Sequence, residues 1–175
     1  KPLEKIPKQL IDEIEPILTN FKTNMPIFLG GSYCRGSPTS RDIDILFSSN
    51  GRNDIQDYLE YLDERFYEIV IYMRGTDKCS LLLPYKGQYI KCDIFITNKQ
   101  EYYAMKMYII GSKQFNIIMR QKAKKQGYLL NQKGLKMNGK MTYFETEKEY
   151  FDAIGISWVQ YGDYKKRDII AKSKS

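Results

Sequence analysis

The sequence predicts a mixed α/β fold of the α+β type, in which a lobe built on a mixed sheet flanked by helices precedes a small lobe of helices and a β patch. Five short apolar or alternating segments lie between residues 26 and 97, and amphipathic segments with helical spacing precede and interrupt them. Beyond residue 98 the spacing becomes mainly helical. We therefore expect two domains, residues 1–98 and 99–175.

The first lobe opens with an amphipathic helix over residues 7–21, which Pro16 is expected to bend or interrupt. A short buried strand over residues 26–30 ends in glycines, and residues 42–47 alternate as a half-buried strand does. Apolar spacing then predicts a helix over residues 53–66. Three further strand candidates complete the sheet, at residues 67–73, 79–84 and 88–97.

The second lobe is predicted to contain three helices and a short β patch. Its last helix should begin with a capping box, because Thr146 and Glu149 have the spacing for one. A break at Gly111 and Ser112 separates its first two helices. The expected ranges are 99–108 and 113–126 for these two helices and 128–143 for the β patch.

The helix over residues 113–126 has two different faces. At 100° per residue, four polar side chains fall within an arc of about 80°: Lys113, Asn116, Arg120 and Lys124. Phe115, Ile118 and Met119 lie opposite, while Ile117 falls on the polar side. One face should pack against a core, and the other can bind nucleic acid or remain a solvated charged face.

The composition excludes several catalytic classes. The chain has no histidine, so it cannot form a Ser-His or Cys-His pair or use an imidazole as a general base. Cys34, Cys79 and Cys92 lie far apart without a C-x-x-C spacing, which argues against a zinc site and favours reduced, packed thiols. Any chemistry should therefore depend on carboxylates and a metal ion.

The charge is divided unevenly along the chain. Residues 1–100 hold 13 Lys and Arg against 14 Asp and Glu, whereas residues 101–175 hold 15 against 7. A cationic second half favours binding to a polyanion such as nucleic acid, because each phosphate contact releases a counterion. A merely soluble basic surface is the alternative. No stretch approaches 18 consecutive apolar residues, so no membrane span is expected.

Two carboxylates share one face of a predicted strand. Asp42 and Asp44 are two residues apart, so their side chains point to the same side. Asp93 interrupts an apolar strand and needs a partner. Three such carboxylates suit Mg²⁺ or Mn²⁺, which prefer oxygen ligands, and could hold two ions. The alternative is that these aspartates are solvated or paired with Arg41 or Lys91.

A glycine-rich segment precedes these carboxylates. G-G-S-Y-C-R-G, residues 30–36, follows a predicted strand, so its glycines allow a tight turn and close approach of the backbone. Free amides at a helix start, the Ser32 hydroxyl and the Arg35 guanidinium suit an anion. The segment alone could simply reverse the chain; together with the carboxylates it predicts a site for a nucleoside triphosphate bridged to metal.

These residues together resemble the nucleotidyltransferase fold and, more narrowly, the family X DNA polymerases. In that family G-S-[FY]-x-R-G is followed at a fixed distance by D-x-D, and GSYCRGSPTSRDID keeps this spacing over residues 31–44. The resemblance extends to KIPKQ, CDIF, YIIGSKQFNIIMR, GYLLNQKGL and TEKEYFDAIG. It implies a catalytic palm over residues 1–98 and a thumb over 99–175 that binds the nascent base pair and DNA. We expect these two parts alone, a minimal plan similar to that of a small viral repair polymerase of this family.

The resemblance also implies roles for individual residues. Asp42, Asp44 and Asp93 match the metal-binding aspartates, and Asp93 would accept the proton of the primer hydroxyl. The residues expected to contact the incoming nucleotide are Lys5, Gly31, Ser32, Arg35, Tyr108, Gly111 and Asn116. Those expected to contact DNA are Lys113, Arg120 and Lys124. At the turn between Gly111 and Ser112 the family has a cis peptide.

The resulting hypothesis is a template-directed DNA polymerase that transfers dNMP from dNTP to a primer 3′ hydroxyl. It would fill short gaps in DNA repair, including base excision repair, with two Mg²⁺ ions that Mn²⁺ could replace. We expect a monomer that binds gapped or primer-template DNA and no membrane, inside the cell: in the nucleus or, if viral, in the cytoplasm or virion. Two alternatives stay open: an untemplated nucleotidyltransferase, and a nucleic-acid-binding module with inert carboxylates.

Overall fold

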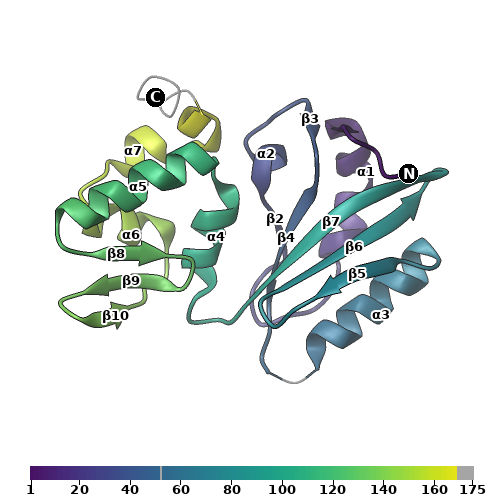
Figure 1. Ribbon diagram of the computed structural model, residues 1–175, viewed down its shortest axis with the longest axis horizontal. Coiled ribbons are helices and arrows are strands. Elements are labelled where there is room, and N and C mark those ends of the chain that lie inside the picture. The colour runs from purple at the N-terminus through teal and green to yellow at the C-terminus, as the bar shows by residue number, and fades with distance from the viewer. Residues whose placement is uncertain (52, 169–175) are drawn as a thin grey trace. The chain divides into compact units, whose positions relative to one another are not determined.

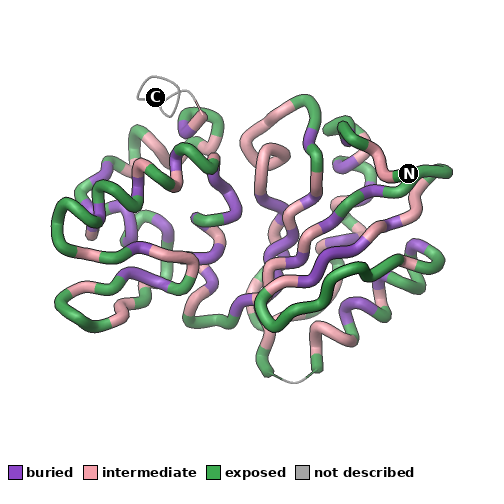
Figure 2. The backbone as a smooth tube through the Cα atoms, viewed as in Figure 1, coloured by how far each residue is buried: buried purple, intermediate pink, exposed green. Residues whose placement is uncertain are grey.

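The computed structural model describes residues 1–51 and 53–168 and divides into two compact units, Lys1–Lys99 and Gln100–Ser175 (Figure 1). Each unit has its own hydrophobic core, and Figure 2 shows the buried segments inside both. The mixed α/β class predicted from the sequence is confirmed. Within the described residues, every helix is too short or too polar to cross a membrane.

A five-stranded mixed sheet forms the centre of unit 1 (Figure 1). Its strand order is β2-β4-β7-β6-β5, in which β4 and β7 are parallel and the other neighbours are antiparallel. Lys86 and Gly87 connect β6 to β7 with positive φ angles of 49° and 75°, as a two-residue hairpin turn requires. The strands are β2 (Phe28–Leu29), β4 (Ile43–Ser48), β5 (Val70–Arg74), β6 (Lys78–Tyr85) and β7 (Gln88–Thr97), each within a few residues of its predicted range.

Two helices, α1 (Lys8–Thr19) and α3 (Asp54–Phe66), cover one face of this sheet. The Tyr58 hydroxyl of α3 donates to the Leu18 carbonyl of α1 at 2.7 Å and ties the two helices together. The buried side chains of the two helices pack on those of the strands, among them Ile11, Ile14, Leu62, Ile45, Leu81 and Cys92. Because successive strand residues alternate between faces, the opposite face of the sheet carries the aspartates.

Two expectations for unit 1 were wrong. Pro16 does not interrupt α1, which runs on to Thr19, because Pro16 lies on the exposed side, where the carbonyl that loses its amide partner can meet water. Strand β4 was expected to be half-buried, but it is buried at every residue except Asp44. Leu46 lies in register between Phe28 and Phe95, and two aromatic side chains on the same face cover it.

Two short strands near the glycine-rich segment were not predicted, whereas the helix start expected in the segment is present. The segment itself forms a single helical turn, α2 (Gly31–Cys34). Beyond it, β3 (Thr39–Ser40) pairs antiparallel with β1 (Ile6–Pro7), with Ile6 opposite Ser40. Strands of two residues have no periodicity that a sequence pattern could reveal. Their pairing brings the segment that contains Lys5 beside the residues that follow α2.

Unit 2 combines the helices α4 to α7 with a three-stranded antiparallel sheet of order β10-β9-β8. The capping box predicted at Thr146 is present, because its hydroxyl accepts a hydrogen bond from the Glu149 amide at 3.2 Å. One helix, α7, was not predicted, since it has a single turn. The elements are α4 (Tyr102–Ile110), α5 (Lys113–Lys125), β8 (Leu129–Asn131), β9 (Gly134–Met137), β10 (Lys140–Thr142), α6 (Glu147–Ala153) and α7 (Trp158–Tyr161).

A buried ion pair holds residues after α7 against the core of unit 2. Arg167 has no exposed surface, and its Nη2 lies 3.1 Å from Oε1 of Glu147. Its Nε donates to the Tyr161 carbonyl at 3.0 Å, and its guanidinium lies 5.2 Å from the centre of the Phe115 ring and 5.1 Å from that of Phe151. Removal of one partner would leave a buried charge uncompensated.

We expect the substitution Glu147→Ala to lower the free energy of unfolding of unit 2 by about 3 to 5 kcal/mol, because Arg167 stays buried without its counter-ion. Urea unfolding followed by fluorescence measures this effect, since the single tryptophan, Trp158, packs on Phe151 in the same core. Lys148→Ala is the control. It breaks an exposed pair with Asp152 and should cost less than about 1 kcal/mol. Equal losses in the two variants would contradict the prediction.

Candidate active site and nucleic-acid interface

The three predicted aspartates lie at neighbouring positions of unit 1. In the parallel pair of β4 and β7, Asp44 lies directly opposite Asp93. Asp42 stands immediately before β4, two residues from Asp44. All three are partly exposed, while their neighbours Ile43 and Cys92 are buried. The alternation predicted for β7, with Asp93 opposite the apolar face, is therefore present.

The electrostatics of this group are unfavourable to ionisation. Burial, followed by the charges of Asp93 and Asp42, raises the pKa of Asp44 to about 7. Burial and the charge of Asp93 also raise the pKa of Asp42, and the positive charges of Lys91 and Lys78 oppose this. A carboxylate whose pKa is raised by neighbouring carboxylates lies where a bound cation is favourable.

Asp93 has two protein partners on the adjacent strand β6. The Ser80 hydroxyl donates to its Oδ1 at 2.6 Å, and the Lys78 ammonium lies 3.9 Å from its Oδ2. Over residues 1–51 and 53–168, no three acidic, thiol or imidazole side chains gather closely enough to hold a metal ion. The oxygen donors suit Mg²⁺ or Mn²⁺, so the donor set fits a hard cation, and metal binding by these aspartates stays a prediction.

The glycine-rich segment contacts Asp44 directly. The Gly30 amide donates to the Asp44 carbonyl at 2.8 Å. Gly31 has a φ of +64°, and a Cβ atom at this residue would lie 2.5 Å from Oδ2 of Asp44. Only glycine allows both the backbone angle and this approach. The close approach expected of the glycines therefore occurs, and its partner is the carboxylate.

The residues expected to bind phosphate lie around the same segment. The Ser32 hydroxyl donates to the hydroxyl of Ser40, which is buried, at 2.7 Å. Arg35 is partly buried, and its charge acts against the raised pKa of Asp44. Lys5 is exposed and directly precedes Ile6, which pairs with Ser40. The fold thus brings segments far apart in sequence to one end of unit 1.

Three residues at this site were not predicted: Ser40, Lys78 and Ser80. Each is a partner of a predicted residue and lies on another strand. Only the pairing registers, Ile6 with Ser40 and Ser80 with Asp93, bring them there. The position of Ser40 depends on pairing with a distant segment, whereas the pairing of Ser80 with Asp93 follows from the two-residue turn at Lys86 and Gly87, which sets the register of β6 against β7.

In unit 2, the helix α5 has the two faces that its sequence predicted. Phe115, Met119 and Ala123 are buried, whereas three of the four polar residues are exposed: Lys113, Arg120 and Lys124. Ile117 is 40% exposed, as its place on the polar side implied. Gly111 and Ser112 precede the helix through a cis peptide bond, which the resemblance implied, and Ser112 caps the helix by accepting from the Phe115 amide at 3.2 Å.

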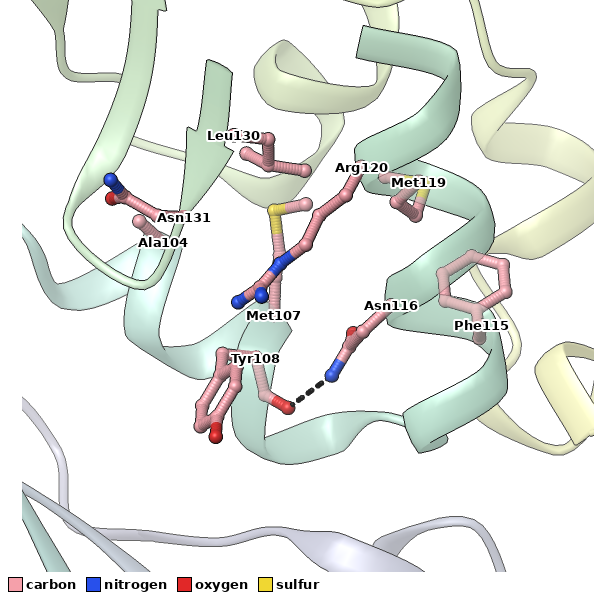
Figure 3. A pocket seen from close by; sticks show the side chains of 9 residues that line it. All are labelled: Ala104, Met107, Tyr108, Phe115, Asn116, Met119, Arg120, Leu130 and Asn131. Carbon is pink, nitrogen blue, oxygen red and sulfur yellow. Dashed lines mark hydrogen bonds between the residues drawn. The ribbon is translucent and has the colours of Figure 1, made fainter. Parts of the chain in front are cut away.

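A pocket opens between α4, α5 and β8 (Figure 3). The Asn116 side-chain amide donates to the Tyr108 carbonyl at 2.8 Å, and the Arg120 guanidinium lies 5.5 Å from the centre of the Tyr108 ring. These three residues therefore form one cluster on unit 2. The lining is completed by Ala104, Met107, Phe115, Met119, Leu130 and Asn131.

Comparison of the sequence with known proteins finds similarity to DNA polymerases. Residues 105–163 match the family model of the DNA polymerase beta thumb. A DNA polymerase/3′-5′ exonuclease PolX of Bacillus subtilis (strain 168) is 25% identical over 146 residues, which are 82% of this chain. The chain is therefore similar to the DNA polymerase beta thumb over residues 105–163 and, more weakly, to a PolX polymerase over most of its length.

The chain spans about a quarter of the length of that Bacillus relative. The thumb match includes all the residues that the sequence predicted to bind nucleotide or DNA in unit 2: Tyr108, Gly111, Lys113, Asn116, Arg120 and Lys124. The comparisons do not bear on the minimal viral-type plan, and the roles of individual residues remain predictions.

We expect Asp44→Asn to stabilise the protein at pH 8 when divalent ions are removed. Because the pKa of Asp44 is raised to about 7 in the folded state, its contribution to stability is present below its ordinary value of about 3.9 and is lost as pH rises through about 7. The variant should gain at least about 1 kcal/mol at pH 8 and nothing near pH 4. Urea unfolding at both pH values measures the difference.

The control for this experiment is Asp152→Asn, which makes the same change of charge at an exposed site in α6. It should change the stability by a similar small amount at both pH values. A pH dependence in Asp44→Asn no greater than that in the control would contradict the repulsion described for the three aspartates.

We expect Gly31→Ala to cost more stability than Gly87→Ala. Both glycines have positive φ, 64° and 75°, but an alanine methyl at Gly87 meets nothing within 4 Å, whereas at Gly31 it meets Asp44. The backbone cost of about 1 to 2 kcal/mol should be common to both, with at least about 1 kcal/mol more at Gly31 for displacement of Asp44. Urea unfolding monitored by circular dichroism compares the two, and equal losses would contradict the contact.

Proposed function

We propose that this chain belongs to the family X DNA polymerases and is a template-directed DNA polymerase that adds dNMP from dNTP to a primer 3′ hydroxyl and fills short gaps in DNA repair. The observation that carries the proposal is the register in which Asp44 of β4 lies opposite Asp93 of β7, with Gly31 in contact with Asp44. Carboxylates on adjacent strands beside a glycine-rich turn are suited to a nucleotide whose phosphates are bridged to cations.

The roles of the residues in unit 1 follow from their chemistry. Asp42, Asp44 and Asp93 would together hold two divalent ions, with Mg²⁺ as the expected ion and Mn²⁺ as a substitute. When bound, such ions supply positive charge that neutralises phosphate oxygens. Asp93 accepts the proton of the primer hydroxyl at a carboxylate oxygen, as the primer oxygen bonds to the α-phosphorus and pyrophosphate leaves.

The remaining residues of unit 1 bind and orient. The Ser32 hydroxyl and the Arg35 guanidinium are suited to the triphosphate oxygens, one as a neutral donor and one as a planar cation. Lys5 adds an exposed ammonium at the same end of the unit. Orientation of the reacting groups and fixed positive charge account for most of the rate in transfers of this kind.

The proposed role of unit 2 is to bind nucleotide and DNA. Tyr108, Gly111 and Asn116 would contact the incoming nucleotide. Lys113, Arg120 and Lys124 lie on the exposed face of α5 and would bind the DNA, whose phosphates attract the excess of positive charge in this half. This charge supports DNA as the partner.

Primer extension tests the proposal. With Mg²⁺ and a labelled primer on gapped, recessed and single-stranded substrates, we expect growth only where a template base is present, with the added nucleotide set by that base. Asp93→Asn should lower kcat/KM by at least about 100-fold, because the proton acceptor is lost. Asp152→Asn, on the exposed side of α6, is the matched control and should leave the rate unchanged.

Two outcomes would overturn the proposal. Growth without a template would make the protein an untemplated nucleotidyltransferase. Absence of growth, with DNA binding unaffected by Asp42→Asn, would make it a nucleic-acid-binding module whose carboxylates are inert.

A further inference from the structure

The carboxylate of Asp93 belongs to a row of side chains that crosses three strands. In register, Asp44 of β4, Asp93 of β7 and Ser80 of β6 lie side by side. The Ser80 hydroxyl donates to Oδ1 of Asp93 at 2.6 Å, and Ser80 is only 4% exposed. A short hydrogen bond from a buried hydroxyl to a carboxylate is among the stronger ones in proteins.

The second oxygen of Asp93 has a partner of a different kind. The Lys78 ammonium lies 3.9 Å from Oδ2, and it also lies 5.3 Å from the centre of the Phe95 ring, the residue opposite Lys78 in register. The Lys78 side chain is 43% exposed. An ion pair at this distance and exposure is weak and easily exchanged.

The two partners of Asp93 therefore differ in permanence. The bond from Ser80 is short and buried, and its loss would leave one carboxylate oxygen of Asp93 without this donor. The contact with Lys78 is long and solvated, so a cation that approaches Oδ2 can displace the ammonium without leaving a buried group unpaired.

We propose that Ser80 and Lys78 are positioning residues for Asp93. Ser80 fixes the orientation of the carboxylate, and the Lys78 ammonium neutralises the second carboxylate oxygen until a divalent cation replaces the ammonium. The inference rests on the proposed function for the identity of the cation. It assigns to β6 a role at the active site that no motif in the sequence indicates.

The proposal requires that the two residues affect cation binding in opposite directions. Loss of the Ser80 hydroxyl should weaken binding, because the carboxylate is no longer held in one orientation; loss of such an outer partner typically costs about 10-fold or more. Loss of the Lys78 charge should strengthen binding by about 3-fold, because a positive charge near the cation is removed.

Titration of the full chain with Mn²⁺ alone, without DNA or nucleotide and followed by electron paramagnetic resonance, tests this directly. We expect Ser80→Ala to raise the Kd for Mn²⁺ about 10-fold and Lys78→Met to lower it about 3-fold. Ser80→Thr and Lys78→Arg keep the hydroxyl and the charge, and both should stay close to the wild type.

Two variants serve as matched controls. Ser48→Ala removes a buried hydroxyl of β4 that has no hydrogen-bond partner among the described residues. Lys86→Met removes a lysine that pairs with Glu13 at the turn between β6 and β7. Neither should alter the affinity for Mn²⁺. Urea unfolding of every variant separates loss of the site from loss of the fold, and the exposed Lys78 variants should fold as the wild type does.

Steady-state primer extension adds a second readout. Ser80→Ala should lower kcat about 10-fold with little change in KM for dNTP, because the proton acceptor is misplaced while the phosphate contacts remain. Ser80→Thr should restore most of the loss. If Ser80 had only a structural role, Ser80→Ala would lower the stability, and Ser80→Thr would not restore kcat.

Clear outcomes would overturn the inference. If Ser80→Ala and Lys78→Met both bind Mn²⁺ as the wild type does, or both change the affinity in the same direction, the assigned roles are wrong even where the wild type extends primers. If the wild type extends no primer, the proposed function fails. The Mn²⁺ titration still decides whether β6 positions Asp93.

Discussion

The parallel pairing of β4 and β7 is the constraint on which the site depends. This register sets Asp44 opposite Asp93, with Asp42 two residues away, and so gathers three negative charges at one end of the sheet. Such a group is unfavourable without compensation, as the raised pKa values of Asp44 and Asp42 indicate. The packed opposite face, held by α1 and α3, supplies the stability that keeps the strands in this register.

The surroundings of the aspartates are organised around this repulsion. Gly31 brings its backbone against Asp44, which no residue with a Cβ atom could do. Lys78 and Ser80 engage the two oxygens of Asp93. The surroundings of the three aspartates therefore combine the backbone of α2 with a hydroxyl and an ammonium group of β6.

Unit 2 exposes positive charge on its surface and also has a hydrophobic core of its own. Helix α5 does so by dividing its residues between a buried apolar face and an exposed polar one. The Arg167 guanidinium, stacked between aromatic rings and paired with Glu147, shows that a cation can also be used inside that core. Positive charge in unit 2 therefore lies both on the exposed face of a helix and, paired with a carboxylate, inside the core.

The sequence by itself determined most elements of this protein and the residues that bear chemistry. Alternation and helical spacing are local properties, so the strand β7 and the faces of α5 could be predicted, and the motif spacing pointed to Asp42, Asp44 and Asp93. The tertiary structure alone decided their partners. Ser40 reaches the site through pairing with a segment distant in the chain, which no local pattern encodes. Ser80 lies in a hairpin whose two-residue turn sets its register with Asp93, but only the folded sheet shows that its hydroxyl reaches the carboxylate.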